Sequence, residues 1–231
     1  SPPRNKADAW AMRQVWSRAI GVDAERFVTL GQVHGNTVLR ARAADAGRGA
    51  RPHSRQIGLG DALISNEPGV VLFSLHADCL PLLLVDPGRD GHGPAIAAVH
   101  AGWRGTVADV AGETLRAMSE AFGTRAEDVL VCVGPGVGSC CYTVGDEVLA
   151  AWSARAGADG EEAVRALPDG PAFDLGRANA LLLERAGVRP GHIDWSGICT
   201  RCQEDRWFSH RAQGPTTGRF AATIEIRESM A

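Results

Sequence analysis

Apolar residues along this chain gather in short runs near its middle. Residues 70–75, 80–85 and 95–99 are mostly apolar, and a turn rich in Gly, Pro and Asp separates the second run from the third. Runs of this length, bounded by turn residues, are typical of strands that are buried on both faces. The pattern therefore predicts three neighbouring buried strands around which the rest of the chain is organised.

Weaker patterns on both sides of these runs predict further elements. Apolar residues at helical spacing predict helices over residues 7–20, 106–122, 145–156 and 175–186. Glycines at positions 21 and 123 supply stops for the first two helices. The predicted strands are residues 27–30, 37–39, 61–65, 128–133, 193–195 and 220–226, with loops at 41–56 and 157–171. No repeat or sharp change in composition divides the chain, so we expect a single α+β domain over residues 1–231.

The composition is that of an ordinary globular protein. The chain has 231 residues, of which 45% are hydrophobic and 22% charged, and its net charge is −3. A nucleic-acid-binding surface needs clustered positive charge, and a membrane span needs about 18–20 consecutive apolar residues; neither pattern occurs. No signal-peptide pattern is found, and the six cysteines are expected to be reduced because the chain can build a core without disulfides. These features predict a cytoplasmic protein without nucleic-acid or membrane partners.

Three reactive side chains lie at the ends of predicted strands. They are His34, Cys79 and His100. Taken singly, a buried cysteine is most often a small hydrophobic residue, and a histidine can be a hydrogen-bonded core residue. Two imidazoles and one thiolate brought together would form a ligand set that zinc accepts, with a fourth position open for water. Because the three residues are far apart in the sequence, their spacing alone leaves both interpretations open.

Other motifs also have a functional and a structural interpretation. Arg104 lies on a glycine-flanked turn after the third apolar run, where it could bind an anion such as phosphate or form a surface ion pair. The Cys199-x-x-Cys202 pair has no second pair at zinc-ribbon spacing, which favours a structural turn. Residues 134–138 lack the lysine and spacing of a phosphate-binding loop, so we expect a tight turn that lines a pocket. No role for His76 follows from the sequence.

A series of short motifs occurs in order along residues 10–228. They are Gln32-Val33-His34-Gly35, Asp61-Ala62-Leu63-Ile64, Ala77-Asp78-Cys79-Leu80-Pro81, His100-Ala101-Gly102-Trp103-Arg104-Gly105, Gly134-Pro135-x-x-Gly138-x-Cys140-Cys141-Tyr142, Cys199-Thr200-x-Cys202, Phe208-Ser209-x-Arg211 and Thr217-Gly218-Arg219. Together they resemble the YfiH family, also called the multicopper polyphenol oxidase or laccase-domain family.

The resemblance implies a layered α/β/β/α fold of the YfiH type, within the α+β class. It implies a zinc ion, with copper as the alternative, held by His34, Cys79 and His100, which would also be the catalytic residues. It further implies purine nucleoside phosphorylase activity on adenosine, inosine and methylthioadenosine, with some adenosine deaminase activity. Arg104 would then bind phosphate. The family's N-terminal strand would be missing or only vestigial at Ser1-Pro2-Pro3.

The partners expected from this resemblance are small molecules, namely a purine nucleoside and phosphate. The chain itself is expected to be a monomer or a weak homo-oligomer. The zinc-dependent phosphorylase is the function we expect.

Three other functions fit parts of the pattern. A polyphenol oxidase would need about ten histidines for a blue-copper site and a trinuclear site, whereas the chain has seven, so we do not expect a full multicopper enzyme. A cysteine hydrolase that edits peptidoglycan precursors would use Cys79 as its nucleophile and His100 as its base. A non-enzymatic zinc module would need a fourth protein ligand, for which Asp78 is the candidate.

Overall fold

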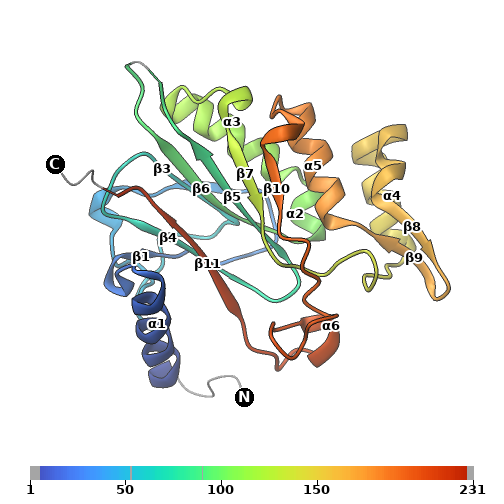
Figure 1. The fold of residues 1–231 in the computed structure, drawn as a ribbon, viewed down its shortest axis with the longest axis horizontal. Helices are drawn as coiled ribbons and strands as arrows, with labels where there is room; N and C mark the ends of the chain where they lie inside the picture. The colour runs from blue at the N-terminus through green and yellow to red at the C-terminus, as the bar shows by residue number, and fades with distance from the viewer. Residues whose placement is uncertain (1–5, 53, 90, 228–231) are drawn as a thin grey trace.

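The computed structural model describes residues 6–52, 54–89 and 91–227 (Figure 1). The expected remnant of an N-terminal strand, Ser1-Pro2-Pro3, lies outside the described residues.

A six-stranded mixed sheet forms the centre of the fold. Its strands run in the order β10 (Ile193–Trp195), β7 (Leu130–Val133), β5 (Leu80–Asp86), β6 (Ala95–Ala101), β3 (Ala62–Ser65) and β2 (Val38–Arg40). The inner pairs, β7 with β5, β5 with β6 and β6 with β3, are antiparallel, whereas the outer pairs are parallel. Two of the three predicted central strands, β5 and β6, therefore lie side by side in this sheet.

The third central strand belongs to a second, smaller sheet. This sheet has the order β1 (Phe27–Val28), β4 (Val71–His76) and β11 (Phe220–Glu225). Its inner face packs on the large sheet through buried apolar side chains such as Leu72 and Ile96. The strand predicted over 27–30 is therefore shorter than expected, whereas those predicted over 70–75 and 220–226 are confirmed within a residue.

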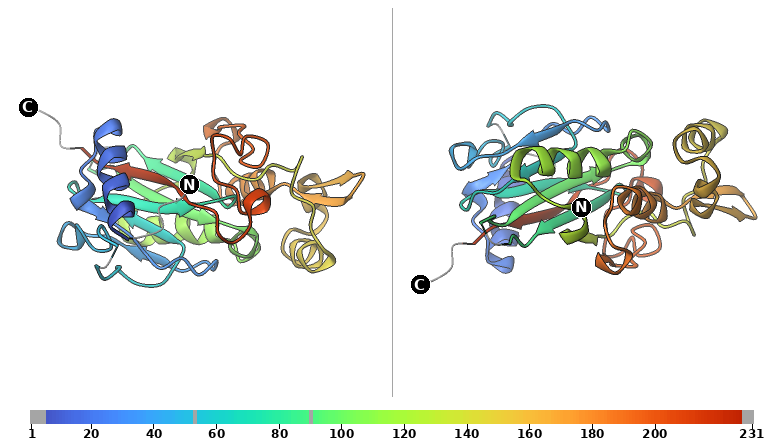
Figure 2. Two further views of the ribbon diagram at one scale, coloured as in Figure 1. Left: turned by 90° about the horizontal axis from the view of Figure 1, so that it is seen from below. Right: turned by 90° about the horizontal axis from the view of Figure 1, so that it is seen from above.

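Helices cover the outer face of each sheet (Figure 2). On the small sheet, Trp16 of α1 (Lys6–Ile20) packs against Phe27 and Phe73, with ring centroids 6.3 and 6.2 Å apart. On the large sheet, α3 (Val110–Phe122) and α5 (Leu175–Arg185) pack over the buried strands. The layers therefore follow the order helix, sheet, sheet, helix, which confirms the α/β/β/α arrangement that the resemblance implies.

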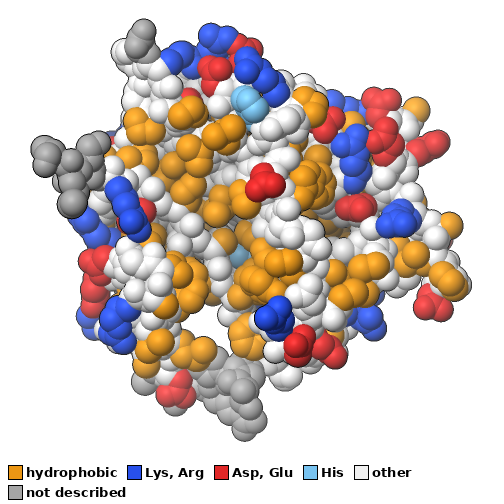
Figure 3. All heavy atoms as spheres, in the orientation of Figure 1, with side chains coloured by type: hydrophobic (Ala, Val, Ile, Leu, Met, Phe, Trp, Pro, Cys, Tyr) orange, Lys and Arg blue, Asp and Glu red, His pale blue; other side chains and the backbone are white. Residues whose placement is uncertain are grey.

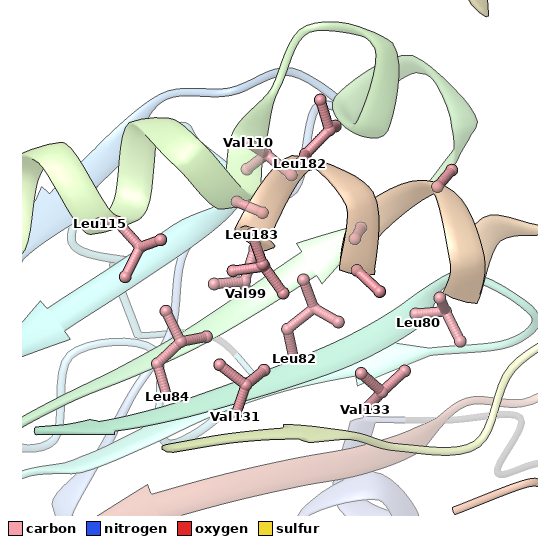
Figure 4. Close-up of a cluster of buried hydrophobic side chains, with 14 of the residues drawn as sticks. Leu80, Leu82, Leu84, Val99, Val110, Leu115, Val131, Val133, Leu182 and Leu183 are labelled. Carbon is pink, nitrogen blue, oxygen red and sulfur yellow. The ribbon is translucent and has the colours of Figure 1, made fainter. Parts of the chain in front are cut away.

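The core beneath α3 and α5 explains why the central runs are so apolar. Figure 4 shows Leu82, Leu84 and Val131 pointing from the large sheet toward Leu115 and Leu183 on the two helices. Leu82 and Leu84 are completely buried. Removing a leucine side chain from water stabilises a fold by about 1.5–3 kcal/mol, so this layer fixes the strands that carry the site at their ends.

The helix predicted over residues 106–122 is confirmed from Val110 to its end before Gly123, but its continuous start at Thr106 is wrong. The chain forms α2 (Trp103–Val107), breaks, and then forms α3. Asp109 adopts a left-handed conformation with φ of 63°, and its carboxylate accepts a hydrogen bond from the backbone N–H of Gly112. This capping interaction starts a new helix, although the apolar periodicity continues across the break.

The prediction of a loop over residues 157–171 is also wrong. A 3-10 helix, η4 (Gly157–Ala163), leads into a hairpin of β8 (Val164–Leu167) and β9 (Gly170–Phe173), which follows α4 (Asp146–Ala156). Each strand has only four residues, and their sequences, VRAL and GPAF, show no regular alternation of polar and apolar residues that would indicate a strand.

The remaining short elements lie in the connections between the longer helices and strands. They are η1 (Ala24–Arg26), η2 (Ala43–Asp45), η3 (Ala126–Asp128), η5 (Pro190–His192) and α6 (His210–Gln213). Within the predicted loop 41–56, η2 is the only such element that the structure describes.

The small sheet covers only part of the face of the large sheet on which it packs. Beside it, hydrophobic side chains of the large sheet reach the surface. Figure 3 shows a band of them across this face. A shallow hollow there is lined by Leu83, Leu130, Cys132 and Ile224, and Leu130 is 46% exposed. Cys132 therefore faces away from α3 and α5, on the side of the large sheet where the small sheet packs.

Candidate metal and active site

The structure brings the three predicted ligands together. His34 lies in the loop between β1 and β2, Cys79 immediately precedes β5, and His100 lies near the end of β6. Their ligand atoms all lie within 4.8 Å of one another. The antiparallel register of β5 and β6 pairs Pro81 with His100, which places the start of one strand beside the end of the other. The site thus lies where the chain passes from the small sheet to the large one.

One buried carboxylate organises this site. Asp61 Oδ1 accepts hydrogen bonds from His100 Nδ1 and from the backbone N–H of His34, both at 2.9 Å. Asp61 Oδ2 accepts from the N–H groups of Gly35 at 2.7 Å and Val33 at 3.3 Å. A carboxylate bonded to the far nitrogen of a histidine ligand fixes its tautomer and orientation, leaving Nε2 free for a metal. Sequence reasoning missed this role, although Asp61 directly precedes β3.

The backbone on both sides of the site adopts an unusual conformation. His34 and Asp78 have φ values of 62° and 85°, in the left-handed region that non-glycine residues rarely adopt. The Asp78 carboxylate accepts hydrogen bonds from the Thr200 hydroxyl and from the backbone N–H of Arg211, both at 2.6 Å. Asp78 is therefore engaged away from the three donors and is not part of their group.

His76 holds the backbone of Cys79. Its Nδ1 donates to the Cys79 carbonyl oxygen at 3.1 Å, and its Nε2 accepts from the Ser74 hydroxyl at 2.7 Å. Its ring also stacks on Phe220 of β11, with centroids 5.7 Å apart. Burial first, and then the charge of His100, lower the pKa of His76 to about 3, so it is neutral at neutral pH. This buried histidine is a positioning residue for Cys79.

Cys79 and His100 each stabilise the charged form of the other. Burial alone would raise the pKa of the Cys79 thiol, but hydrogen bonds and positive charge from His100 and His34 lower it to about 7. Burial alone would lower the pKa of His100, but Asp61 and the Cys79 thiolate raise it to about 9. The thiolate, which is the form of cysteine that binds metals, is therefore accessible near neutral pH.

The donor set fits a metal ion with one open side. Two imidazoles and one thiolate suit zinc and also copper. His34 is exposed, Cys79 partly exposed and His100 buried, so the side of the group near His34 faces solvent. A site with three protein donors and an accessible side leaves room for water or a substrate, as in catalytic zinc sites.

Arginines lie near this site on the side of Tyr142. The Arg104 guanidinium stacks on Trp103 at 4.3 Å, and the Arg211 guanidinium stacks on Tyr142 at 5.0 Å. Burial first, and then the Cys79 thiolate, raise the pKa of Tyr142 to about 12, while Arg211 and Arg104 act in the opposite direction. Among the described residues, Arg104 forms no ion pair with an acidic side chain. The alternative role considered for it, a surface ion pair, is therefore not supported.

A second group of donors was not expected. Cys199 and Cys202 do lie in a turn, but Cys140 and Cys141 meet them there, and the four sulfur atoms lie within 4.8 Å of one another. The interpretation of Cys199-x-x-Cys202 as merely a structural turn is therefore incomplete. Residues 134–138, expected to line a pocket, lead into this second group instead.

Gly102 offers a test of how tightly the first site is packed. A Cβ atom at this position would lie 2.8 Å from Cys79 Sγ and 3.4 Å from His34 Cδ2. We expect Gly102→Ala to displace the thiol and to weaken metal binding at least tenfold while the protein stays folded. Chelator competition and circular dichroism would measure the two effects. Gly145→Ala is the matched control, because a Cβ there meets nothing within 4 Å; equal metal affinity in both variants would contradict the prediction.

Comparison with known proteins supports the resemblance seen in the motifs. The chain is 37% identical over 205 residues to "Purine nucleoside phosphorylase YlmD" of Geobacillus stearothermophilus, covering 88% of this chain and 73% of that protein. It is 35% identical over 160 residues to "Adenosine deaminase RL5" from an unknown prokaryotic organism, covering 69% of this chain and 59% of that protein. The crystal structure of the Bacillus licheniformis hypothetical protein YfiH matches with a TM-score of 0.89 and 28% identity, covering 96% of this chain and 82% of that chain.

Within the described residues, no helix combines the length and apolar character that a membrane crossing requires.

The family assignment extends over almost all of the sequence. Residues 5–227 match the family described as multi-copper polyphenol oxidoreductase laccase. The fold, the ordered motifs and this match agree, and the chain therefore belongs to the multi-copper polyphenol oxidoreductase laccase family, to whose YfiH members its motifs are similar.

Proposed function

We propose that this protein is a purine nucleoside phosphorylase that also deaminates adenosine, with zinc held by His34, Cys79 and His100. The observation that carries the proposal is the convergence of these three donors in a chain 37% identical to a purine nucleoside phosphorylase. Adenosine, inosine and methylthioadenosine are the proposed nucleosides, and copper is the alternative metal. We place the protein in the cytoplasm, acting on small molecules as a monomer or weak homo-oligomer.

The residues around the donors keep the site ready for a metal. Asp61 holds His100 by its Nδ1 and fixes the loop of His34 through its backbone N–H. His76 holds the carbonyl oxygen of Cys79. When bound, zinc would act as a Lewis acid that favours hydroxide over water near neutral pH, which suits attack on the purine C6 in deamination.

Phosphorolysis needs an anion held beside the ribose. A phosphate oxygen forms a bond to C1′ while the bond from C1′ to the purine nitrogen breaks, and its electron pair leaves with the base. Positive charge develops on the ribose in this step, so a fixed phosphate stabilises it. The positive charges of Arg104 and Arg211 both act to lower the pKa of Tyr142. We assign these two arginines to phosphate binding. Tyr142 stays protonated at neutral pH and is available as an O–H donor.

Product analysis tests the reaction directly. Zinc-loaded protein is incubated with adenosine, with and without phosphate, and the bases and nucleosides are separated by chromatography. We expect free adenine only when phosphate is present, because phosphate is the attacking group, and inosine in both reactions. Absence of both products would contradict the proposed function.

Arg104→Ala tests the phosphate site. A hydrogen bond to a charged group contributes about 1.5–3 kcal/mol, so we expect a rise of roughly ten- to a hundredfold in the KM for phosphate. Deamination, which needs no phosphate, should change much less. Arg116→Ala is the control, because Arg116 is an exposed arginine on α3 that pairs with Glu113 and Glu120. An unchanged KM for phosphate in Arg104→Ala would remove this residue from the site.

One observation favours a second function, the editing of peptidoglycan precursors by a cysteine hydrolase. Cys79, His100 and Asp61 form a chain of nucleophile, base and orienting carboxylate, and the pKa of Cys79 is lowered to about 7. In such a hydrolase His34→Ala would retain activity and chelators would have no effect. In the zinc enzyme both treatments should abolish turnover.

The family's descriptive name does not make this chain a copper oxidase. The described residues contain two groups of three or more potential ligands, one with two histidines and one with four cysteines. A multicopper oxidase needs a histidine-rich trinuclear site in addition to a blue-copper site. Neither group supplies one, so we do not propose polyphenol oxidation.

A further inference from the structure

The four-cysteine group lies between two loops that leave the same edge of the large sheet. Cys140 and Cys141 follow β7, whereas Cys199 and Cys202 follow β10. Because β7 and β10 pair in parallel, their following loops emerge side by side (Figure 1). The parallel pairing of distant strands is what brings these cysteines together.

The sulfur atoms have the spacing of a metal site. Cys202 Sγ lies 3.4 Å from Cys141 Sγ and 3.6 Å from Cys140 Sγ. Four thiolates around one zinc ion, with bonds of about 2.3 Å, stand about 3.8 Å apart at the corners of a tetrahedron. A disulfide would need about 2.05 Å, and all four cysteines are free. The group is therefore close to the size of a tetrahedral sulfur cage.

Backbone contacts hold the cage in shape. The N–H of Thr200 donates to the carbonyl oxygen of Gly136 at 2.9 Å, and that of Gly136 donates to Ile198 at 3.2 Å. The N–H of Gly138 points at Cys199 Sγ, 3.3 Å away. The Arg201 guanidinium lies 3.6 Å from Cys141 Sγ. N–H donors and a cation beside the sulfurs offset the negative charge that four thiolates leave around a divalent ion.

We propose that Cys140, Cys141, Cys199 and Cys202 bind a structural zinc ion that joins the loop after β7 to the loop after β10. Four sulfur donors in tetrahedral spacing favour zinc or an iron–sulfur centre over calcium, magnesium or manganese. A site with four protein ligands has no open position, so this ion supports the structure and does not take part in the reaction. It is separate from the ion proposed for His34, Cys79 and His100.

The same two loops hold the residue next to Cys79. Thr200, between the two cysteines of the second loop, donates its hydroxyl to the Asp78 carboxylate at 2.6 Å. From the first loop, the N–H of Val137 donates to the Asp78 carbonyl oxygen at 2.9 Å. A metal that fixes both loops would therefore fix the left-handed turn at Asp78 and, through it, the start of β5.

Metal analysis of the purified protein tests the proposal. We expect two zinc ions per chain, one for each donor group, by elemental mass spectrometry. The double variant Cys140→Ser/Cys202→Ser should retain one, and Cys132→Ser, which lies outside both groups, should retain both. Loss of no zinc in the double variant, or iron in place of zinc, would overturn the assignment.

Cadmium provides a second measurement that does not depend on folding of the double variant. In Cys79→Ala protein from which bound metal has first been removed by a chelator, the four-cysteine group is the remaining group of donors among the described residues, so one added equivalent of cadmium should give the ultraviolet charge-transfer band of cadmium–thiolate bonds. The free thiol count should fall by four when the ion binds. No band, or thiols already lost to disulfides in the purified protein, would contradict the proposal.

Discussion

Cys79→Ala protein is expected to lose the zinc of the catalytic group and all measurable turnover of adenosine. The substitution removes one of three donors and the only sulfur in that group, and it leaves two imidazoles that hold a metal weakly. Zinc content would fall from two ions to one per chain, and adenine formation in phosphate would fall to the background rate. Elemental analysis and chromatography of the products measure the two losses on the same sample.

Cys132→Ser is the control for this experiment, because Cys132 is an exposed cysteine outside both donor groups, on the side of the large sheet away from α3 and α5. It should keep both zinc ions and full activity. Turnover that persists in Cys79→Ala and still depends on zinc would show that Cys79 is not a ligand. Comparison with His34→Ala then separates the zinc enzyme, which loses activity in both variants, from a thiol hydrolase, which loses it only with Cys79.

Asp61→Asn is expected to have the second largest effect. The asparagine has the shape of Asp61, but its amide N–H₂ would face N–H donors on one side, because both carboxylate oxygens now accept hydrogen bonds. Leaving buried donors unpaired costs about 1–3 kcal/mol of folding free energy. Loss of a carboxylate behind a histidine ligand also weakens metal binding, typically about ten- to a hundredfold.

Two measurements separate these effects of Asp61→Asn. Chelator competition gives the zinc affinity, and urea unfolding gives the free energy of unfolding. Asp128→Asn is the control, since Asp128 pairs with Arg89 at the surface, where an ion pair contributes about 0–1 kcal/mol. An unchanged zinc affinity in Asp61→Asn would mean that this carboxylate does not position His100.

The elements that the sequence predicts well are those decided by burial. The runs at 80–85 and 95–99 become β5 and β6 because both faces of the large sheet are covered, so nearly every position is apolar. The break between α2 and α3 could not be predicted, since it depends on one left-handed residue, Asp109, within a continuous apolar stripe. The β8–β9 hairpin escaped prediction because each of its strands has only four residues, with no regular alternation of polar and apolar positions.

The donor residues show the same contrast. His34, Cys79 and His100 stand out in the sequence because they follow predicted strands, the family resemblance implies their role as ligands, and the structure brings them together. Asp61 was missed because its role lies in hydrogen bonds to backbone groups that no local pattern reveals. The four-cysteine group was missed for a different reason. It forms only when β7 and β10, which are far apart in the sequence, pair in parallel.

The position of β11 in the small sheet has a consequence for synthesis of the protein. All three donors of the catalytic group precede β11 by a long stretch of sequence, so they leave the ribosome well before it. Yet β11 pairs with β4 along its whole length, and Phe220 covers the ring of His76 that holds Cys79. The nascent chain would therefore expose its thiol and imidazoles before the strand that steadies them arrives, and we expect metal loading to follow the docking of β11.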